Sequence, residues 1–244
     1  TNNCYANQEK VLRQHLFQNY SKDMIPVANS NQPLNIETGI AIQNLEEFNQ
    51  KVETIKLNIW WRMNWNDANL HWNSSQYGLG FLSVDSDQVW IPDLELFNAA
   101  SLPEIYTLKG GIMLYSDGSL MWSRPGIFKF SCSLQLKQFP YDSQECTMTF
   151  GSWIYDNQKI HIQPYADSAK AIDILDEFSH SEWDVEGVKL STGTITDDNG
   201  NLKDTITYTI SLKRYSHYYN LSMGMTITLV FVSFIIMLVA PDNL

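Results

Sequence analysis

The chain is poor in the residues that mark metal sites and nucleic-acid surfaces. It has three cysteines, no C-x-x-C and five histidines without metal-ligand spacing, so we expect no metal and no cofactor. Lys and Arg number 16 against 27 Asp and Glu, which gives a formal net charge of −11. Nucleic-acid binding needs a concentrated basic face, so we expect no nucleic-acid partner, and the acidic balance instead raises the local concentration of cations.

The short motifs of common enzyme classes are also missing. No G-x-S-x-G, H-E-x-x-H or P-loop occurs. Gly78-Leu79-Gly80 begins like a dinucleotide fingerprint, but Ser83 stands where the third glycine would be, so we interpret this stretch as a loop. We therefore predict no enzyme activity and no catalytic residue.

Between roughly residues 33 and 215 the chain consists of short runs rich in Thr, Ile, Tyr and Trp. Examples are VETIKLNIWWRMNW, CTMTFGSWIY and DTITYTISLKR, with turn signals such as Ser-Asp-Gly at 116–118. Many short strands at this spacing predict an antiparallel β-sandwich. Ahead of them, apolar residues at helical spacing predict an amphipathic α-helix over about 6–19.

The only long uncharged run is LSMGMTITLVFVSFIIMLVA, from Leu221 to Ala240. Twenty residues cross a bilayer as a helix, and Tyr218 and Tyr219 stand where interfacial aromatics belong. A buried soluble helix, the alternative, is rarely apolar or small on every face. We predict an extracellular domain over 1–217, and over 218–244 a transmembrane helix with the start of the linker that follows it.

Three tripeptides and two cysteines favour an extracellular compartment. Asn19, Asn73 and Asn220 each open an N-x-Ser sequon for N-glycosylation. Cys132 and Cys146 enclose thirteen residues, and a disulfide between them would stabilise the fold by about 3 kcal/mol on the loop-entropy model. Two reduced, buried cysteines are the alternative.

The loop between these cysteines carries Phe-Pro-Tyr-Asp at 139–142, in a β-rich chain that ends in a membrane helix. This combination closely resembles the signature of the Cys-loop receptors, the pentameric ligand-gated ion channels. Other stretches follow in that family's order: NIWWRMNWND at 58–67 resembles loop D and VWIPDLELFN at 89–98 resembles loop A. RPGIFKFSC and MTFGSWIYD are similar to the nicotinic acetylcholine receptor branch in particular. The resemblance covers nearly the whole chain.

The resemblance implies a mainly β, immunoglobulin-like antiparallel sandwich of about ten strands, with an N-terminal α-helix and four membrane helices, the first of which is present here. It implies a subunit that forms a pentamer with identical or homologous subunits in the plasma membrane, at a postsynaptic site. Expected partners are the lipid bilayer, permeating cations and a small organic ligand, either an amine or an amphipathic molecule. A ligand-binding or adhesion sandwich without channel activity, soluble or anchored, and an anion-selective relative are the alternatives.

Nicotinic relatives bind their ligand between two subunits, in a box of aromatic rings that attracts a cationic amine. The matching motifs place one group of residues on the principal face of this site, and we call it the principal set: Phe97, Trp153, Tyr155, Ile195 and Leu202. They place a second group on the complementary face, which the neighbouring subunit contributes, and we call it the complementary set: Trp60, Met113, Met121 and Ser123. For Trp65, Trp90 and Trp122 we predict positions in the sandwich core instead.

Loop C, at 191–208, departs from the acetylcholine-binding pattern. It has no cysteine and no aromatic residue before Tyr208, and Asp198-Asn199-Gly200 predicts a tight hairpin tip. Ile195 and Leu202 would fill space that rings occupy in acetylcholine-binding subunits. We therefore expect acetylcholine to bind weakly or not at all when this chain supplies the principal face.

The resemblance also implies that the disulfide loop passes the binding signal to the membrane helices. The residues expected in this role are Phe139, Pro140, Tyr141, Asp142 and Arg214. Arg214, if buried, needs an acidic partner, for which Asp142, Glu46 and Glu47 are all candidates. We expect Arg214→Gln to abolish gating in the complete receptor while leaving pentamers at the cell surface.

Overall fold

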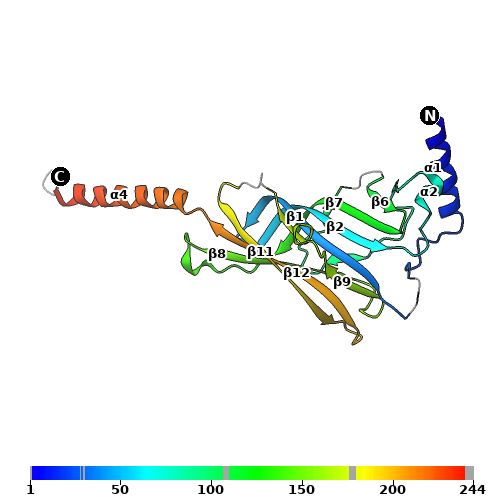
Figure 1. Cartoon of the computed structure of the whole chain (residues 1–244). Helices are drawn as coiled ribbons and strands as arrows, with labels where there is room; N and C mark the ends of the chain where they lie inside the picture. Colours follow the sequence, from blue (N-terminus) through cyan, green and yellow to red (C-terminus); the bar gives the residue numbers. More distant parts are fainter. Residues whose placement is uncertain (1, 28, 30, 107–109, 176–179, 240–244) are drawn as a thin grey trace.

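The structure is a computed structural model that describes the whole chain except residues 1, 28, 30, 107–109, 176–179 and 240–244. The predicted linker after the membrane helix therefore lies outside the described residues. The helices are α1 (Asn2–Phe17), α2 (Ser74–Tyr77), α3 (Ser168–Ala171) and α4 (His217–Val239), with a 3-10 turn η1 (Leu136–Gln138). Helices α1 and α4 lie at opposite ends of a body made of strands (Figure 1).

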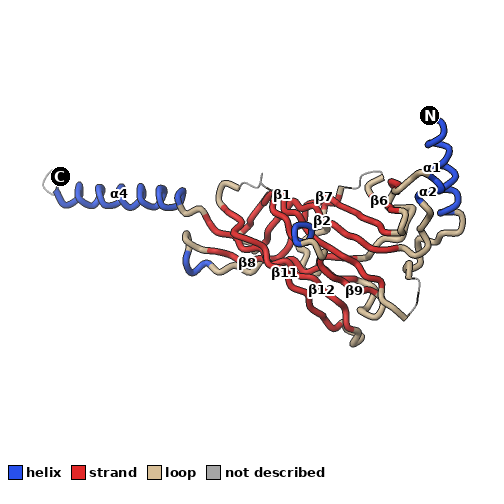
Figure 2. Tube along the Cα trace, in the orientation of Figure 1, coloured by secondary structure: helices blue, strands red, loops and turns tan. Residues whose placement is uncertain are grey.

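Twelve strands in the described residues form two sheets (Figure 2). The larger sheet contains β10 (Ile172–Ile174), β1 (Leu34–Asn49), β2 (Thr54–Asn66), β7 (Ser119–Ser131), β6 (Ile112–Tyr115) and β3 (Phe81–Val84), in that order, with β5 (Glu104–Ile105) paired to β7 and β9 (Ile160–Pro164) paired to β1. The smaller sheet has the order β11 (Trp183–Thr196), β12 (Leu202–Arg214), β8 (Ser143–Ser152) and β4 (Leu94–Leu96).

The predicted mainly β sandwich with an N-terminal helix is confirmed. It has twelve strands rather than about ten, and three of them, β4, β5 and β10, are only two or three residues long. The pairing is also not antiparallel throughout, because β9 and β10 both run parallel to β1. Helix α1 is offset by a few residues from the predicted segment 6–19.

Alternation of buried and half-buried residues explains why the strands face the way they do. In β2 every second residue from Ile55 to Trp65 is buried, while the residues between them face away from the core. Period-two burial of this kind leaves one face of a strand for the core and the other for solvent or a partner. The outward positions of β2 include Trp60, which belongs to the complementary set.

Aromatic rings join the two sheets at the centre of the sandwich. Trp61 of β2 lies 4.6 Å, centroid to centroid, from Phe150 of β8, which in turn lies 6.1 Å from Tyr208 of β12. Such offset and edge-to-face contacts add to the free energy of burial. The predicted core tryptophans Trp65, Trp90 and Trp122 are indeed buried, with 2%, 5% and 8% of their surface exposed.

Helix α4 extends away from the sandwich (Figure 1). The segment His217–Leu238, 22 residues, is long and apolar enough to cross a membrane, and its side chains are exposed in the isolated chain. A helix that is apolar on every side and has no protein around it is stable only in lipid or against other apolar helices. Tyr218 and Tyr219 lie in its first turn, next to the sandwich.

Candidate ligand-binding site

Phe97 and Trp153 lie together on the outer face of the smaller sheet. β4 and β8 pair antiparallel, with Leu94 opposite Ser152 and Leu96 opposite Phe150. The two rings, each just after the end of its strand, are 6.4 Å apart in an edge-to-face arrangement. A Cβ atom added to Gly151 would lie 2.6 Å from the Phe97 ring, so the glycine makes room for this ring. The sequence therefore brings two residues of the principal set into contact although they are 56 positions apart.

The carboxylate of Asp93 fixes the turn that carries Trp153. Its Oδ1 accepts a hydrogen bond of 2.7 Å from the Ser152 hydroxyl, and its Oδ2 accepts one of 2.6 Å from the backbone N–H of Ile154. The Trp153 side chain is consequently held with 68% of its surface exposed. Tyr155, also assigned to the principal set, is instead half-buried and packs against the core. Asp93 lies within the VWIPDLELFN stretch but was not among the predicted site residues.

The β11–β12 hairpin stands beside this turn, with Ile195 and Leu202 near its tip, 40% and 49% exposed. The chain turns at Asp198-Asn199-Gly200, as predicted, and the backbone N–H of Asp197 donates to the carbonyl oxygen of Asn201 at 2.9 Å across the turn. Asp197 organises it by accepting backbone hydrogen bonds of 2.9 Å from Asn199 and 2.8 Å from Asn201, and among the tip residues only Gly200 has positive φ, 85°. Bonds from Asn201 hold the pKa of the Asp197 carboxyl below its usual range.

One contact of this hairpin was not expected from the sequence. Lys203, opposite Ile195 in the hairpin, reaches across to the loop after β8, where its ammonium group donates a hydrogen bond to the backbone carbonyl oxygen of Trp153. In addition, the backbone N–H of Asn157 donates to the carbonyl oxygen of Leu202 at 2.8 Å. The hairpin and the Trp153 turn are thus joined at two points, and a positive charge lies at the principal set.

The complementary set lies on the outer face of the larger sheet. Trp60 is opposite Pro125 in the β2–β7 pair, Ser123 is opposite Arg62, and Met121 is opposite both Asn64 and Met113. Trp60, Met113, Met121 and Ser123 are all half-buried, as outward positions of a sheet are. The four residues therefore share one surface that runs across three neighbouring strands.

The two sets do not meet within one chain. The rings of Phe97 and Trp153 are on the outer face of the smaller sheet, whereas Trp60 and its neighbours are on the outer face of the larger sheet, with the aromatic core between them. Any site that uses both sets needs two chains, each contributing a different face.

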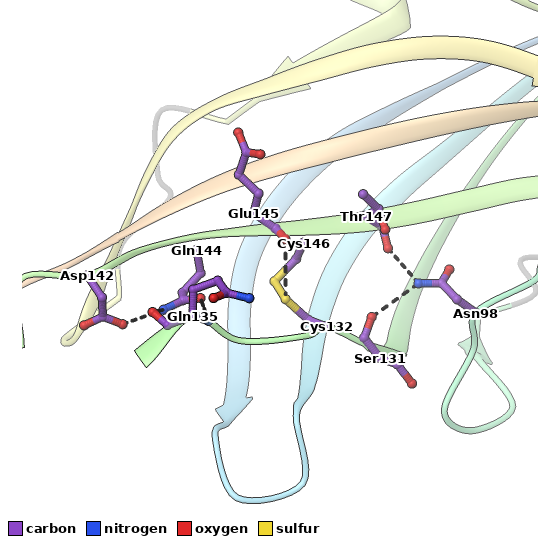
Figure 3. Close-up of a disulfide and its surroundings, with 9 residues drawn as sticks. All are labelled: Asn98, Ser131, Cys132, Gln135, Asp142, Gln144, Glu145, Cys146 and Thr147. Atoms are coloured by element: carbon purple, nitrogen blue, oxygen red, sulfur yellow. Dashed lines mark hydrogen bonds between the residues drawn. A yellow bond between two sulfur atoms is a disulfide. The ribbon is translucent and has the colours of Figure 1, made fainter. Parts of the chain in front are cut away.

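Cys132 and Cys146 form a disulfide, with their Cα atoms 5.0 Å apart, so the alternative of two reduced cysteines is excluded (Figure 3). Both cysteines are buried, at 3% and 0% exposed. Next to the disulfide, the amide of Asn98 donates to the carbonyl oxygens of Ser131 and Thr147, at 3.3 and 2.7 Å. These bonds connect the segment after β4 to the end of β7, which Cys132 follows, and to β8, which contains Cys146.

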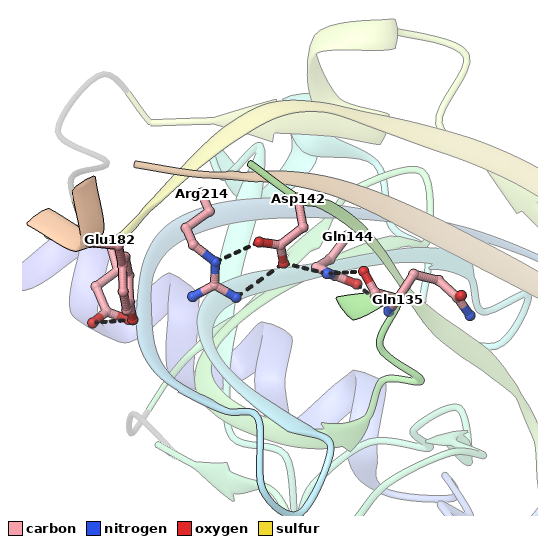
Figure 4. Close-up of polar contacts among 6 residues, drawn as sticks. Gln135, Asp142, Gln144, Glu182 and Arg214 are labelled. Atoms are coloured by element: carbon pink, nitrogen blue, oxygen red, sulfur yellow. Dashed lines mark hydrogen bonds and ion pairs between the residues drawn. The ribbon is translucent and has the colours of Figure 1, made fainter. Parts of the chain in front are cut away.

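Arg214, at the end of β12, pairs with Asp142 of the disulfide loop (Figure 4). Its Nε and Nη2 donate to the two carboxylate oxygens at 2.7 and 3.1 Å, and the two side chains are 0% and 1% exposed. The Gln144 amide donates to the same carboxylate at 2.6 Å. Of the three candidate partners, the structure selects Asp142; Glu46 pairs with Lys56 instead, and Glu47 accepts from Asn49.

The disulfide loop also contacts the first turn of α4. The rings of Phe139 and Tyr219 are 5.0 Å apart, and the Tyr141 hydroxyl donates to the side-chain oxygen of Asn220 at 2.7 Å. Pro140, between these two aromatics, is buried. The guanidinium of Arg214 lies 5.0 Å from the Phe139 ring and 4.1 Å from the Trp183 ring. The loop, the end of the sandwich and the start of the apolar helix thus form one contiguous packed group.

The sequon asparagines lie in three different settings. Asn19 and Asn73 are exposed, and the Asn73 side chain also caps α2 by accepting from the Ser75 backbone N–H at 3.0 Å. Asn220 lies within α4 and is already bonded to Tyr141. Exposure leaves the first two open to modification, while Asn220 lies at the predicted membrane boundary.

The geometry agrees with a comparison against known families. The model of the neurotransmitter-gated ion-channel ligand binding domain matches residues 9–216. The chain belongs to this neurotransmitter-gated ion-channel family. It is 31% identical over 236 residues to acetylcholine receptor subunit beta-like 1 of Drosophila melanogaster, which covers 96% of this chain and 45% of the relative. It is 32% identical over 220 residues to human neuronal acetylcholine receptor subunit beta-3, covering 90% and 47%.

A third relative, acetylcholine receptor subunit alpha-type acr-16 of Caenorhabditis elegans, is 34% identical over 177 residues, covering 72% of this chain and 35% of the relative. The chain thus spans less than half the length of these curated relatives. The residues that the family model matches, 9–216, include both sheets, both candidate sets and the disulfide. They end just before α4.

Proposed function

We propose that this chain is the extracellular ligand-binding domain and first membrane span of a subunit of a pentameric, cation-selective ligand-gated ion channel in the plasma membrane. The family match and the names of the relatives support the class of protein. The acidic balance of the chain, with a net charge of −11, favours cations over anions near the surface. A small amine or amphipathic ligand opens the channel by binding between adjacent extracellular domains.

The observation that carries this proposal is the position of the two candidate sets on opposite outer faces. A contact between two different faces is heterologous, and it generates a closed ring when the rotation between neighbouring subunits closes on itself. A ring in which each principal set meets the next subunit's complementary set holds one site at every interface. A symmetric dimer that joins like faces would leave the two sets apart.

The signal then passes from the β11–β12 hairpin through the smaller sheet to the disulfide loop. Ligand contact at Trp153 acts on β8, and β8 leads back to the loop that holds Asp142 against Arg214. Phe139 and Tyr141 contact the first turn of α4 directly. A shift of β8 relative to β12 therefore moves the end of the apolar helix.

Complementation of two variants tests the proposal in cells that express the complete subunit. Trp153→Ala and Trp60→Ala each remove one half of every site, so we expect each variant alone to need at least about tenfold more ligand for half-maximal current. Mixed rings contain interfaces where both halves are intact, so co-expression should restore sensitive currents. The ligands to be applied are acetylcholine and a panel of small amines and carboxylates, with acetylcholine expected to be weak or inactive.

Two results would contradict the proposal. One is a current whose ligand sensitivity is the same in both variants as in the wild type. The other is a mixture that responds no better than the single variants. The reversal potential in the same recordings should follow the sodium gradient, and a potential that follows chloride would refute cation selectivity.

A further inference from the structure

Lys203 places a positive charge at the principal set, where a cationic ligand would have to bind. Its ammonium donates to the carbonyl oxygen of Trp153, and its side chain is half-buried between the hairpin and the Trp153 turn. An ammonium group has three donors, so this contact leaves two of them available. In the part of the chain that the structure describes, Lys203 makes no ion pair.

The carboxylates around Lys203 have other partners. Asp93 accepts from Ser152 and Ile154, and the hydrogen bonds of the hairpin tip converge on Asp197. Asp204, the next residue along β12, pairs with His161 of β9 at 2.5 Å. The charge of Lys203 adds to the lowering of the Asp197 pKa, so the two groups attract each other over a distance without forming an ion pair. None of these carboxylates directly bonds the Lys203 ammonium, so its two remaining donors are available to a ligand at this face.

Apolar side chains also lie near the ammonium. Trp153 offers a largely exposed ring next to Phe97, and Ile195, which is opposite Lys203 and so on the same face of the hairpin, supplies exposed aliphatic surface. Leu202 is the next residue along the strand and points to the other face. This combination suits a small molecule with an apolar body and one carboxylate, because hydrogen bonds between an ammonium and a carboxylate are charge-assisted. An amine of the same size would meet a like charge beside the Trp153 carbonyl oxygen, to which Lys203 already donates.

We propose that Lys203 selects the ligand of this site, so that the principal face binds small amphipathic monocarboxylates in preference to amines. This inference rests on the proposed function, since it concerns the same interface between subunits. The proposed function allows either an amine or an amphipathic ligand. The charge of Lys203 instead favours a ligand with one negative charge. It also gives a direct reason for weak acetylcholine binding: the quaternary ammonium of acetylcholine would lie next to a like charge beside Trp153.

Binding of a matched pair of probes tests the inference. Phenylacetate and phenethylamine have similar size and one aromatic ring each, but opposite charge. Titration calorimetry on the complete assembled protein in lipid nanodiscs should show phenylacetate binding at least about tenfold more tightly. Lys203→Met should weaken phenylacetate by about tenfold and strengthen phenethylamine, while Lys203→Arg should keep the wild-type order.

Lys213→Met is the matched control, because Lys213 lies on the same strand, is 60% exposed and pairs with Glu186 at 3.3 Å. We expect it to leave both affinities unchanged. A Lys203 that only ties the hairpin to the Trp153 turn would change both affinities in the same direction in Lys203→Met, and that result would overturn the inference. Absence of binding by either probe, or tighter binding of the amine to the wild type, would overturn it as well.

The inference and the proposed function fail in different ways. If Trp153→Ala abolishes binding of both probes while Lys203→Met leaves their ratio unchanged, the site stands and the charge selection is refuted. If the complementation of Trp153→Ala by Trp60→Ala fails, the site between subunits is refuted, whatever the order of the two probes.

Discussion

Asp142→Asn is expected to lower the free energy of unfolding by about 3–5 kcal/mol, the cost of leaving a buried charge without its partner. Arg214 and Asp142 are 0% and 1% exposed, so water cannot replace the lost carboxylate. Domains of this kind are typically stable by about 5–15 kcal/mol, so the variant loses a large part of its stability. Urea unfolding of the detergent-solubilised chain, followed by tryptophan fluorescence, measures the change.

The exposed pair of Lys213 and Glu186 provides the control, since its side chains are 60% and 45% exposed. Surface pairs contribute about 0–1 kcal/mol, so Glu186→Gln should have little effect. Equal destabilisation by Asp142→Asn and Glu186→Gln would contradict the importance of burial. The double variant Arg214→Met with Asp142→Leu removes both charges, and it should recover most of the stability that the single variant loses.

The same pair makes stability depend on pH. Burial alone would raise the pKa of Asp142, but hydrogen bonds from Arg214 and Gln144 outweigh it and hold the pKa below the usual range for a carboxyl group. A carboxyl group whose pKa is lowered by folding stabilises the fold above its unfolded pKa, about 3.9. This contribution is lost as the pH falls through the lower, folded value. The stability difference between wild type and Asp142→Asn should therefore shrink below about pH 4.

Burial also changes what we expect from Arg214→Gln. From the sequence, this variant should lose gating while pentamers still reach the cell surface. In the structure, the substitution leaves the Asp142 carboxylate buried without its counter-charge. We therefore expect less protein at the surface as well as loss of gating. Surface labelling and current measured on the same cells separate the two effects, and wild-type current per surface subunit would refute the coupling role of Arg214.

Removing the disulfide with Cys132→Ala and Cys146→Ala should lower the free energy of unfolding by about 3 kcal/mol. The bond joins residues 14 positions apart, and on the loop-entropy model it stabilises the fold by restricting the unfolded chain. Urea unfolding of the double variant and of the wild type gives the difference. Dithiothreitol should destabilise the wild type by the same amount and leave the double variant unchanged. An unchanged urea midpoint in the double variant would contradict this account.

Much of the fold was predictable from local patterns in the sequence. Period-two burial in β2 follows directly from the alternation in IKLNIWWRMNW, and the uncharged run became α4 with the expected tyrosines at its start. What the patterns did not contain is the parallel pairing of β9 and β10 with β1. These strands lie more than a hundred positions from β1 in sequence, and the only local signal for each is a short apolar segment.

The candidate site was predictable where a motif fixed it. The contact between Phe97 and Trp153 follows from two motifs, whereas the bond from Lys203 to Trp153 joins residues 50 positions apart that belong to no shared motif. The hairpin turns at Asp198-Asn199-Gly200 as predicted, but the hydrogen bonds to the Asp197 carboxylate that organise the tip were not part of that prediction. Similarly, three acidic residues were equally suitable partners for Arg214 until folding brought one of them into contact.

Imaging of the complete assembled protein by single-particle electron cryo-microscopy tests the central claim most directly. The claim is that the two candidate sets, which lie on opposite faces of each sandwich, meet between neighbouring subunits. We predict a closed ring of five in which Trp153 and Phe97 of each subunit face Trp60 and Met121 of the next. Single copies, a dimer that joins like faces, or a ring with either set pointing away from the interface would contradict it.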